Sequence, residues 1–472
     1  MAFAQEIYLS LTAFMLFLVS LAEPKAGVPR KVALTLSGLG IVVAAYAFGQ
    51  NADLFHGTYR VDGFSQSFKL LIAIAFFLAV AFGEGLRGVE LRYEAEYYLF
   101  FCISVLGLTF LVSSVELLTL YISLELSSYA LYILVPLRRE PHTTQVEAGI
   151  KYVLFGAVAS GISLFGMSYV FGLAKTTQID QLLQVFPDLA STPMGLMGLT
   201  MMLGGFFYKL ALFPFHFWTP DIYEGAANET SGIIATLPKI GAVAVLIRLT
   251  GMGGSESVGF HWVLTLFAIL SMTYGNLSAL VQTDLKRLLA YSSISHAGFM
   301  MAGILSGSVA GYAGAMYYVG GYVIMNLALF HVIYSLAPSG QNVTVDDLRG
   351  LYRRSPVLAM TLAVGAFGLA GIPPMAGFAG KFFVLNAAWA GGFHALVIIA
   401  ALNTAIAVFY YLKMVKAAYS PEEEGENVPE EGVALTAPGA VLGGAFVLAI
   451  VIIGAFPGAI LELFQHACEW AS

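Results

Sequence analysis

Apolar stretches of roughly 17–25 residues recur from one end of this chain to the other, and each is long enough to cross a hydrocarbon core of ~30 Å as an α-helix. Only 11% of the 472 residues are charged, whereas a soluble domain carries about 25%. Inside a bilayer every backbone polar group must be hydrogen-bonded within the protein, so only helices or closed barrels can span it. The apolar runs are continuous rather than alternating. The sequence therefore predicts an all-α polytopic membrane protein.

We expect about fourteen transmembrane helices. They are predicted at residues 6–22, 31–49, 66–84, 97–113, 116–136, 150–172, 194–214, 231–250, 261–281, 288–306, 311–336, 356–391, 394–415 and 434–456. The flank of the first carries Glu6 and none of the basic side chains that a signal peptide needs, which indicates an uncleaved helix.

The distribution of Lys and Arg predicts how these helices are oriented. Most basic residues fall in loops after odd-numbered spans, for example Arg138, Arg139, Lys286 and Arg287. Loops after even-numbered spans, and the helix ends beside them, hold only Arg60, Lys175 and Arg248. Because Lys and Arg concentrate in cytoplasmic loops, the odd loops are predicted to be cytoplasmic and both termini to lie on the outer, periplasmic side of a bacterial plasma membrane.

Three lysines lie deep within apolar spans, where a charge costs about 2.5–3.5 kcal/mol and usually lines an ion path or is paired. Lys239 is eight residues past Ser231, roughly 12 Å into its span, which is too deep for snorkelling. Lys209 precedes a break made by two prolines, and Lys381 follows a second break rich in Gly and Pro. Broken helices are where transporters place ion sites, so we expect these lysines to be functional.

Four further titratable residues are candidates for proton transfer. Glu125 is a deep acid in span five, and a carboxylate near a buried lysine can act with it as a proton switch. His216 and His296 lie in or beside apolar helices and titrate near neutral pH, although a lone histidine can also simply bond a neighbour. Lys151 lies near the cytoplasmic end of its span, where snorkelling is the competing interpretation.

Other polar residues are assigned structural roles. Lys69 is near an outer span end and is expected to snorkel, Glu116 at an outer edge is expected to be solvated, and His331 is a weaker candidate. The glutamates of residues 422–431 are interpreted as a solvated linker. Cys102 and Cys468 have no metal or iron–sulfur spacing, no histidines share a helix face at i, i+4, and no nucleotide-binding glycine pattern is present.

The combination of a lysine and a break occurs twice, in spans seven and twelve. A five-helix unit repeated in tandem must invert in the membrane, because five is odd, and transporters often use such inverted repeats. We therefore expect four parts: residues 1–96 with helices 1–3, residues 97–250 and 251–417 as the two inverted repeats, and residues 418–472 with the acidic loop and helix 14.

Four sequence segments now indicate a family. They are EAGIKYVLFGAVASGISLFG (147–166), FYKLALFPFHFWTPDIYEGA (207–226), TDLKRLLAYSSISHAG (283–298) and LRGLYRRSPVLAMTLAVGAFGLAGIPPMAGFAGKFFVLNAA (348–388). Together they resemble the antiporter-like membrane subunits of respiratory complex I, and most closely subunit N. LELSSYALYIL in span five and a lysine at position 381 favour N over subunit M, and the short carboxyl end argues against subunit L. GAANETSGIIA (225–235) departs from the proline-rich GAPTP of many relatives.

The resemblance implies a proton-translocating subunit that couples quinone reduction elsewhere in the complex to proton transfer. Glu125 is similar to the glutamate that modulates a neighbouring lysine, which would be Lys209. Lys239 would be the central relay and Lys381 the output lysine, assisted by His216 and His296, with Lys151 in the charged axis.

No cofactor is expected in this chain. NAD, FMN, iron–sulfur clusters and quinone would be bound by other subunits or elsewhere in the complex, and the partners would be other membrane subunits and the lipid bilayer, with no nucleic acid. Two alternatives stay open: a subunit of a multisubunit sodium–proton antiporter, and a passive scaffold.

Overall fold

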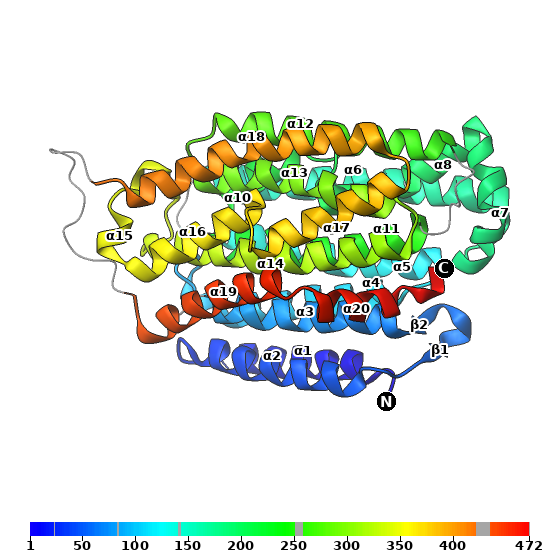
Figure 1. Ribbon diagram of the computed structural model, residues 1–472. Helices are drawn as coiled ribbons and strands as arrows, with labels where there is room; N and C mark the ends of the chain where they lie inside the picture. Colours follow the sequence, from blue (N-terminus) through cyan, green and yellow to red (C-terminus); the bar gives the residue numbers. More distant parts are fainter. Residues whose placement is uncertain (23, 83–84, 140–142, 251–257, 422–434, 472) are drawn as a thin grey trace.

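The computed structural model describes residues 1–22, 24–82, 85–139, 143–250, 258–421 and 435–471, which form a long helical bundle (Figure 1). The first half contains α1 (Ala4–Leu21), α2 (Val28–Ala47), α3 (Gly63–Ala81), α4 (Glu94–Ser113), α5 (Leu117–Leu134), α6 (Thr143–Ala174), α7 (Ile179–Ser191), α8 (Pro193–Met202), α9 (Gly204–Leu210), α10 (Trp218–Gly225) and α11 (Asn228–Thr250). The second half contains α12 (Val258–Leu280), α13 (Leu285–Leu305), α14 (Val309–Leu336), α15 (Leu351–Arg354), α16 (Pro356–Ala370), α17 (Ala376–Ala390), α18 (His394–Tyr419), α19 (Ala437–Ala455) and α20 (Gly458–Ala467).

The all-α polytopic prediction is confirmed. Twelve helices among the described residues are long and apolar enough to cross a membrane. The two other expected spans, 194–214 and 356–391, are each divided into shorter helices, α8 with α9 and α16 with α17. Twelve continuous and two broken helices account for the fourteen expected spans. Two expected part boundaries, after residues 96 and 417, fall just inside α4 and α18.

Both breaks arise from residues that cannot continue a helix. α9 is followed by Ala211, which has a positive φ of 64°, and then by the cis Phe213–Pro214 bond. α16 is followed by Gly371, with φ of 85°, and then by the cis Pro373–Pro374 bond. A glycine adopts this left-handed conformation without a Cβ penalty. The last carbonyls of α9 and α16 therefore lack helical partners inside the bundle.

Several short elements were not expected from the sequence. The strands β1 (Ala52–Leu54) and β2 (Tyr59–Val61) form an antiparallel hairpin between α2 and α3. α7 buries Ile179, Leu182 and Phe186 on one face, and with 13 residues it is too short to span a bilayer. α20 closes the chain near β2 and α3 (Figure 1). These elements carry apolar residues on one side only, so a search for long apolar runs misses them.

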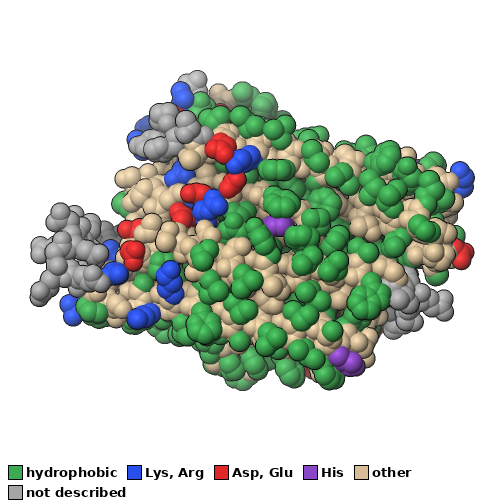
Figure 2. All heavy atoms as spheres, turned by 90° about the horizontal axis from the view of Figure 1, so that it is seen from above, with side chains coloured by type: hydrophobic (Ala, Val, Ile, Leu, Met, Phe, Trp, Pro, Cys, Tyr) green, Lys and Arg blue, Asp and Glu red, His purple; other side chains and the backbone are tan. Residues whose placement is uncertain are grey.

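Charged side chains gather at the ends of the bundle. Figure 2 shows Lys, Arg, Asp and Glu mainly at one end of the visible face, while hydrophobic side chains cover its long middle. Both chain termini lie at the end of the bundle opposite α15 (Figure 1). The apolar middle is the surface that a bilayer would cover.

Two predictions about polar residues near the terminus-bearing end were wrong. Lys69 does not snorkel: it is fully buried, and its Nζ lies 2.6 Å from Glu6 Oε1, which also accepts a hydrogen bond from Tyr59. Glu116 is not solvated: it is 6% exposed and caps α5 by accepting from the backbone N–H of Thr119. Sequence position gave the depth of these residues but not their facing partners. The glutamates of residues 422–431 lie outside the described residues.

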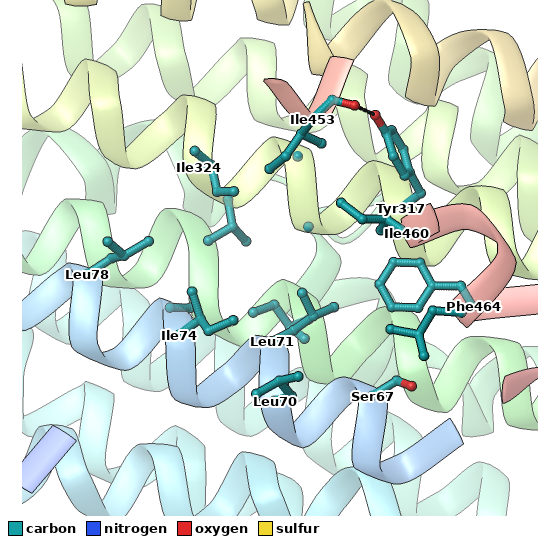
Figure 3. A pocket seen from close by; sticks show the side chains of 16 residues that line it. Ser67, Leu70, Leu71, Ile74, Leu78, Tyr317, Ile324, Ile453, Ile460 and Phe464 are labelled. Atoms are coloured by element: carbon teal, nitrogen blue, oxygen red, sulfur yellow. Dashed lines mark hydrogen bonds between the residues drawn. The ribbon is translucent and has the colours of Figure 1, made fainter. Parts of the chain in front are cut away.

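An apolar cavity of about 220 Å³ lies between α3, α14 and α20 (Figure 3). Leu71, Ile74, Ile324 and Phe464 point into it, and the hydroxyl of Tyr317 at its edge already donates to Ile453 O. Apolar cavities of this kind stay dry. This cavity is therefore not an ion pathway, although its wall includes Ile240, the residue after Lys239.

The departure from the proline-rich pattern gives α11 a polar start. Glu229 is 3% exposed and accepts hydrogen bonds from the backbone N–H groups of Arg87 (2.6 Å) and Gly88 (3.0 Å). Asn228 donates to Gln341 O at 3.1 Å. The first turn of α11 is thus tied to the loop between α3 and α4 and to the segment after α14.

Candidate functional site

Lys239 lies in the middle of α11, a helix buried along nearly its whole length. Lys239 is 1% exposed, and its Nζ donates a 2.5 Å hydrogen bond to the backbone carbonyl of Leu210, the last residue of α9. The C-terminal end of a helix carries partial negative charge on its free carbonyls. The break after α9 therefore supplies the acceptor for this buried ammonium, and no carboxylate lies within ion-pair distance of it among the described residues.

Lys381 repeats this arrangement at the second break. It lies in α17, and its Nζ donates to Leu369 O (3.0 Å) and Ala370 O (3.1 Å), the last two residues of α16. It also lines a cavity of about 430 Å³ together with Trp389 and Thr404. The ammonium is therefore held by helix-end carbonyls while its side chain borders a space that opens between α17 and α18.

Lys209 lies in α9, one residue before Leu210. Its Nζ is buried and has no hydrogen-bond partner among the described residues, and it sits 5.8 Å from the ring centres of Tyr132 and of Tyr152. Cation–π contacts of this length stabilise an ammonium that lacks an anion. Lys209 is thus the one of the three deep lysines whose Nζ makes no hydrogen bond within the described part of the chain, while Glu125 acts on it electrostatically without an ion pair.

Glu125 and Lys209 are not paired in this structure. Glu125 is 7% exposed and accepts a hydrogen bond from Ser160 of α6, while no ion pair joins it to Lys209. The expected carboxylate and lysine are therefore both buried on neighbouring elements but separately held.

His296 lies on α13 between two tyrosines, one from α14 and one from α18. Its Nδ1 is 2.6 Å from Tyr318 Oη, and its Nε2 is 3.0 Å from Tyr411 Oη. Its ring centre is 5.4 Å from that of Tyr322 and 6.4 Å from that of Phe299. Lys381 Nζ lies 4.8 Å from the same Phe299 ring, and Lys239 Nζ lies 5.9 Å from the Tyr322 ring. His296 therefore stands between the two lysines.

His216 lies in the break between α9 and α10. It is 1% exposed, neither ring nitrogen has a hydrogen-bond partner among the described residues, and its ring packs on Phe213, Phe217 and Tyr274. Two unpartnered ring nitrogens in a buried site are uncommon.

Lys151 is set apart from the deep lysines. Its side chain is 33% exposed and pairs with Glu147 (2.5 Å) and Asp221 (2.6 Å). Asp221 also meets Arg287 at 3.0 Å, and Arg287 meets Glu224 at 2.6 Å. We call Lys151, Asp221, Glu224 and Arg287 the charged end cluster; it lies where α6, α10 and α13 meet.

Sequence reasoning missed one buried lysine. Lys286 was counted as a loop charge, but it is the second residue of α13, is fully buried and donates to Ala226 O at 2.8 Å. Its place inside the TDLKRLLAYSSISHAG segment was the available signal. His331 bonds Phe82 O and Gly439 O through its two ring nitrogens, and so ties α14 to α19.

The arrangement can carry protons without any reaction at carbon. Lysine and histidine exist with and without an added proton. Lys239 and Lys381 donate to backbone carbonyls, and His296 contacts two tyrosine hydroxyls. The three lysines are connected by a row of neighbouring groups. Along this row, Leu210 follows Lys209 in the chain and its carbonyl binds Lys239, and ring contacts then lead from Lys239 through Tyr322, His296 and Phe299 to Lys381.

Comparison with known proteins gives a consistent result. The family described as "NADH:quinone oxidoreductase/Mrp antiporter, TM" matches residues 114–407. NADH-quinone oxidoreductase subunit N 2 of Solidesulfovibrio magneticus is 45% identical over 98% of this chain and 97% of that protein.

Solved structures agree with the result of the sequence comparison. A chain of respiratory complex I from Thermus thermophilus superposes with a TM-score of 0.83 and 29% identity over 97% of this chain and 98% of that one. A chain of the Mrp complex from Dietzia has a TM-score of 0.88 at 17% identity, over 99% and 97% of the two chains, which shows a shared fold alone. The chain therefore belongs to the NADH:quinone oxidoreductase/Mrp antiporter family, as an antiporter-like membrane subunit of the subunit N type.

Proposed function

We propose that Lys209, Lys239 and Lys381 form the proton path of a complex I subunit N, with Glu125, His216 and His296 assisting transfer. The observation that carries this proposal is the position of Lys239, whose ammonium is bound to the carbonyl of the residue next to Lys209. A proton handed along this row would move from the first repeat to the second. This chain makes and breaks no bond other than N–H and O–H bonds.

The state of Glu125 sets the charge on Lys209. Here Glu125 accepts from Ser160, and Lys209 rests between two tyrosine rings. Redox chemistry elsewhere in the complex would move Glu125 from Ser160 toward Lys209 or back. Pairing holds a proton on Lys209, and separation releases it to Lys239 and then to Lys381. Lys151, paired with two acids at the charged end cluster, would supply charge to this axis.

The wider assignments follow from the family. NAD, FMN, iron–sulfur clusters and quinone would be bound by other subunits of the complex, and this chain would contact neighbouring membrane subunits and lipid. We propose a multi-pass protein of the bacterial plasma membrane with the charged end cluster on the cytoplasmic side and both termini on the periplasmic side. The division into helices 1–3, two inverted repeats and helix 14 belongs to the same proposal.

The second candidate is a subunit of a multisubunit sodium–proton antiporter. The shared fold with an Mrp chain supports it, but the identity of that chain is low. The much higher identity to a quinone reductase subunit favours complex I.

The test is proton pumping by the intact complex in membrane vesicles, driven by NADH, for wild type and Lys209→Ala. We expect loss of pumping and of coupled quinone reduction while the amount of assembled complex is unchanged. Normal pumping by Lys209→Ala would make Lys209 structural and favour the scaffold interpretation. Pumping that requires sodium and no electron donor would favour the antiporter.

A further inference from the structure

Three hydroxyl groups, the last of which is that of Tyr322 beside Lys239, form a continuous hydrogen-bonded chain. Tyr223 of α10, Ser293 of α13 and Tyr322 of α14 are all buried. Tyr223 Oη is 3.2 Å from Ser293 Oγ, and Tyr322 Oη donates to Ser293 Oγ at 2.8 Å. The three residues come from three different helices, so the chain crosses the junction between the two expected repeats.

One end of this chain adjoins the charged end cluster. Glu224, the residue after Tyr223, pairs with Arg287 at 2.6 Å, and Asp221 lies two residues before it. These ionised side chains are 28–35% exposed, so solvent reaches them. The buried Lys286 donates to Ala226 O on the far side of Tyr223. Tyr223 is therefore a buried residue that lies next to the partly exposed charged end cluster along α10.

The other end reaches the central lysine. Tyr322 Oη has a second acceptor, Ala235 O, at 3.2 Å, and Ala235 lies one helical turn before Lys239 on α11. Lys239 Nζ is 5.9 Å from the Tyr322 ring centre. A tyrosine hydroxyl has one proton, so Tyr322 can point it at Ser293 or at Ala235, but not at both.

We propose that Tyr223, Ser293 and Tyr322 form a hydroxyl relay through which Lys239 takes up protons from the charged end cluster. The inference rests on the proposed function of Lys239 and adds a second step at that lysine, proton uptake from the solvent side, which pumping needs in addition to the step at Lys209. Each hydroxyl oxygen accepts a proton while its own proton passes to the next oxygen. The lysine side chain, leaving Leu210 O, covers the remaining gap to Tyr322. In net terms one proton leaves the solvent and one N–H bond forms on neutral Lys239.

The relay resets by rotation. After a transfer every hydroxyl in the chain points the opposite way, and the alternative acceptor Ala235 O gives Tyr322 a stable orientation from which to turn back. A structural tie between helices would need only one of these bonds. Repeated proton transfer requires hydroxyls that can reorient. Tyr322 has two acceptors, and in the contact of Ser293 with Tyr223 either hydroxyl can be the donor.

The experiment uses the assembled complex in vesicles, with NADH-driven proton pumping measured for Tyr223→Phe, Tyr322→Phe and the double variant. Each change removes one oxygen and keeps the ring. Tyr312→Phe is the matched control, because Tyr312 is also buried on α14 and its hydroxyl has no hydrogen-bond partner among the described residues. Assembled complex is quantified in each membrane preparation.

We expect each single variant to pump about tenfold more slowly than Tyr312→Phe, a change equivalent to ~1.4 kcal/mol in the barrier. Because the groups act in series, the double variant should pump no more slowly than the worse single variant. Single variants within twofold of the control would overturn the relay. Slowing that multiplies in the double variant would also overturn it, because independent structural ties behave that way.

Failure of the relay and failure of the proposed function are distinguished by Lys239→Ala. If Lys239→Ala abolishes pumping and the tyrosine variants pump normally, only the relay is wrong. If Lys239→Ala pumps normally, the proposed function of Lys239 is wrong. A larger slowing in D₂O for Ser293→Ala than for the control would support proton transfer at this chain.

Discussion

Lys239 donates a 2.5 Å hydrogen bond to Leu210 O, which places the ammonium of one span at the open end of the helix before it. Lys381 makes the equivalent contact with Leu369 O and Ala370 O. Carbonyls at the last turn of a helix have no intrahelical donor, and a buried one left unbonded is costly. The free carbonyls at each break therefore stabilise a buried lysine, and the lysine supplies the hydrogen-bond donor that these carbonyls lack.

The first prediction separates charge from proton exchange at Lys239. In Lys239→Arg the guanidinium keeps the positive charge and can still donate to Leu210 O, but it stays protonated throughout the accessible pH range. We expect this variant to assemble normally and to pump at least tenfold more slowly than wild type, as Lys239→Ala does. The measurement is NADH-driven acidification of vesicles normalised to assembled complex. Pumping by Lys239→Arg near the wild-type rate would mean that a fixed charge suffices at this position.

The second prediction concerns Gly371, the residue that ends α16. It has a φ of 85°, and a Cβ there would lie 3.0 Å from Lys381 Cδ. Gly371→Ala should cost about 1–2 kcal/mol of stability from backbone strain and should also displace Lys381, so pumping falls. Gly392→Ala is the control, because Gly392 has a φ of 87° but open space around its Cβ position. It should lower the melting temperature similarly while pumping stays normal, and equal pumping by the two variants would contradict the role of Gly371.

The sequence predicted how deep a charged residue lies along its span, but it did not predict which side chains that residue contacts. Lys209, Lys239 and Lys381 could be predicted because position along an apolar span and nearby Gly or Pro are local properties. The partners of Lys69 and Lys286 were not predictable, since they depend on which side of a helix meets which neighbour. The contacts of Glu125 with Ser160 and of Lys209 with the ring of Tyr152 were not predictable for the same reason, because both partners come from α6.

The third prediction concerns the buried pair of Glu6 and Lys69, whose side chains are 0% and 1% exposed. Removing one partner of a buried pair leaves an uncompensated charge and typically costs 3–5 kcal/mol, whereas replacing both by apolar residues is often neutral. Glu6→Leu and Lys69→Met should therefore each reduce the amount of assembled complex and its melting temperature.

The double variant Glu6→Leu/Lys69→Met should recover most of that loss, and it should pump at the wild-type rate, since neither residue belongs to the proposed path. If the loss of stability in the double variant equalled the sum of the losses in the two single variants, Glu6 and Lys69 would not stabilise each other. A stable double variant that failed to pump would instead place the pair on the proton path.

The fourth prediction is a pH dependence at the terminus-bearing end. Asp62 caps α3 and binds Arg248 Nη2 at 2.8 Å. Burial raises the pKa of Asp62, but the Arg248 guanidinium and the hydrogen bond from Ser65 N–H outweigh burial, so the pKa lies below its ordinary value. A carboxyl whose pKa is lowered by folding stabilises the protein above its unfolded pKa of ~3.9, and that contribution disappears as pH falls through the folded-state pKa.

Asp62→Asn keeps an oxygen for Ser65 N–H and removes the charge, so it should cost about 1.5–3 kcal/mol at neutral pH. The difference in melting temperature between wild type and Asp62→Asn should shrink as the pH falls below the unfolded pKa of ~3.9, and it should approach zero once Asp62 of the folded wild type is itself protonated. Asp53→Asn is the control: Asp53 pairs with Arg60 but is 60% exposed, so its loss should cost less than about 1 kcal/mol. A pH-independent difference for Asp62→Asn would mean that packing rather than charge joins α3 to the end of α11.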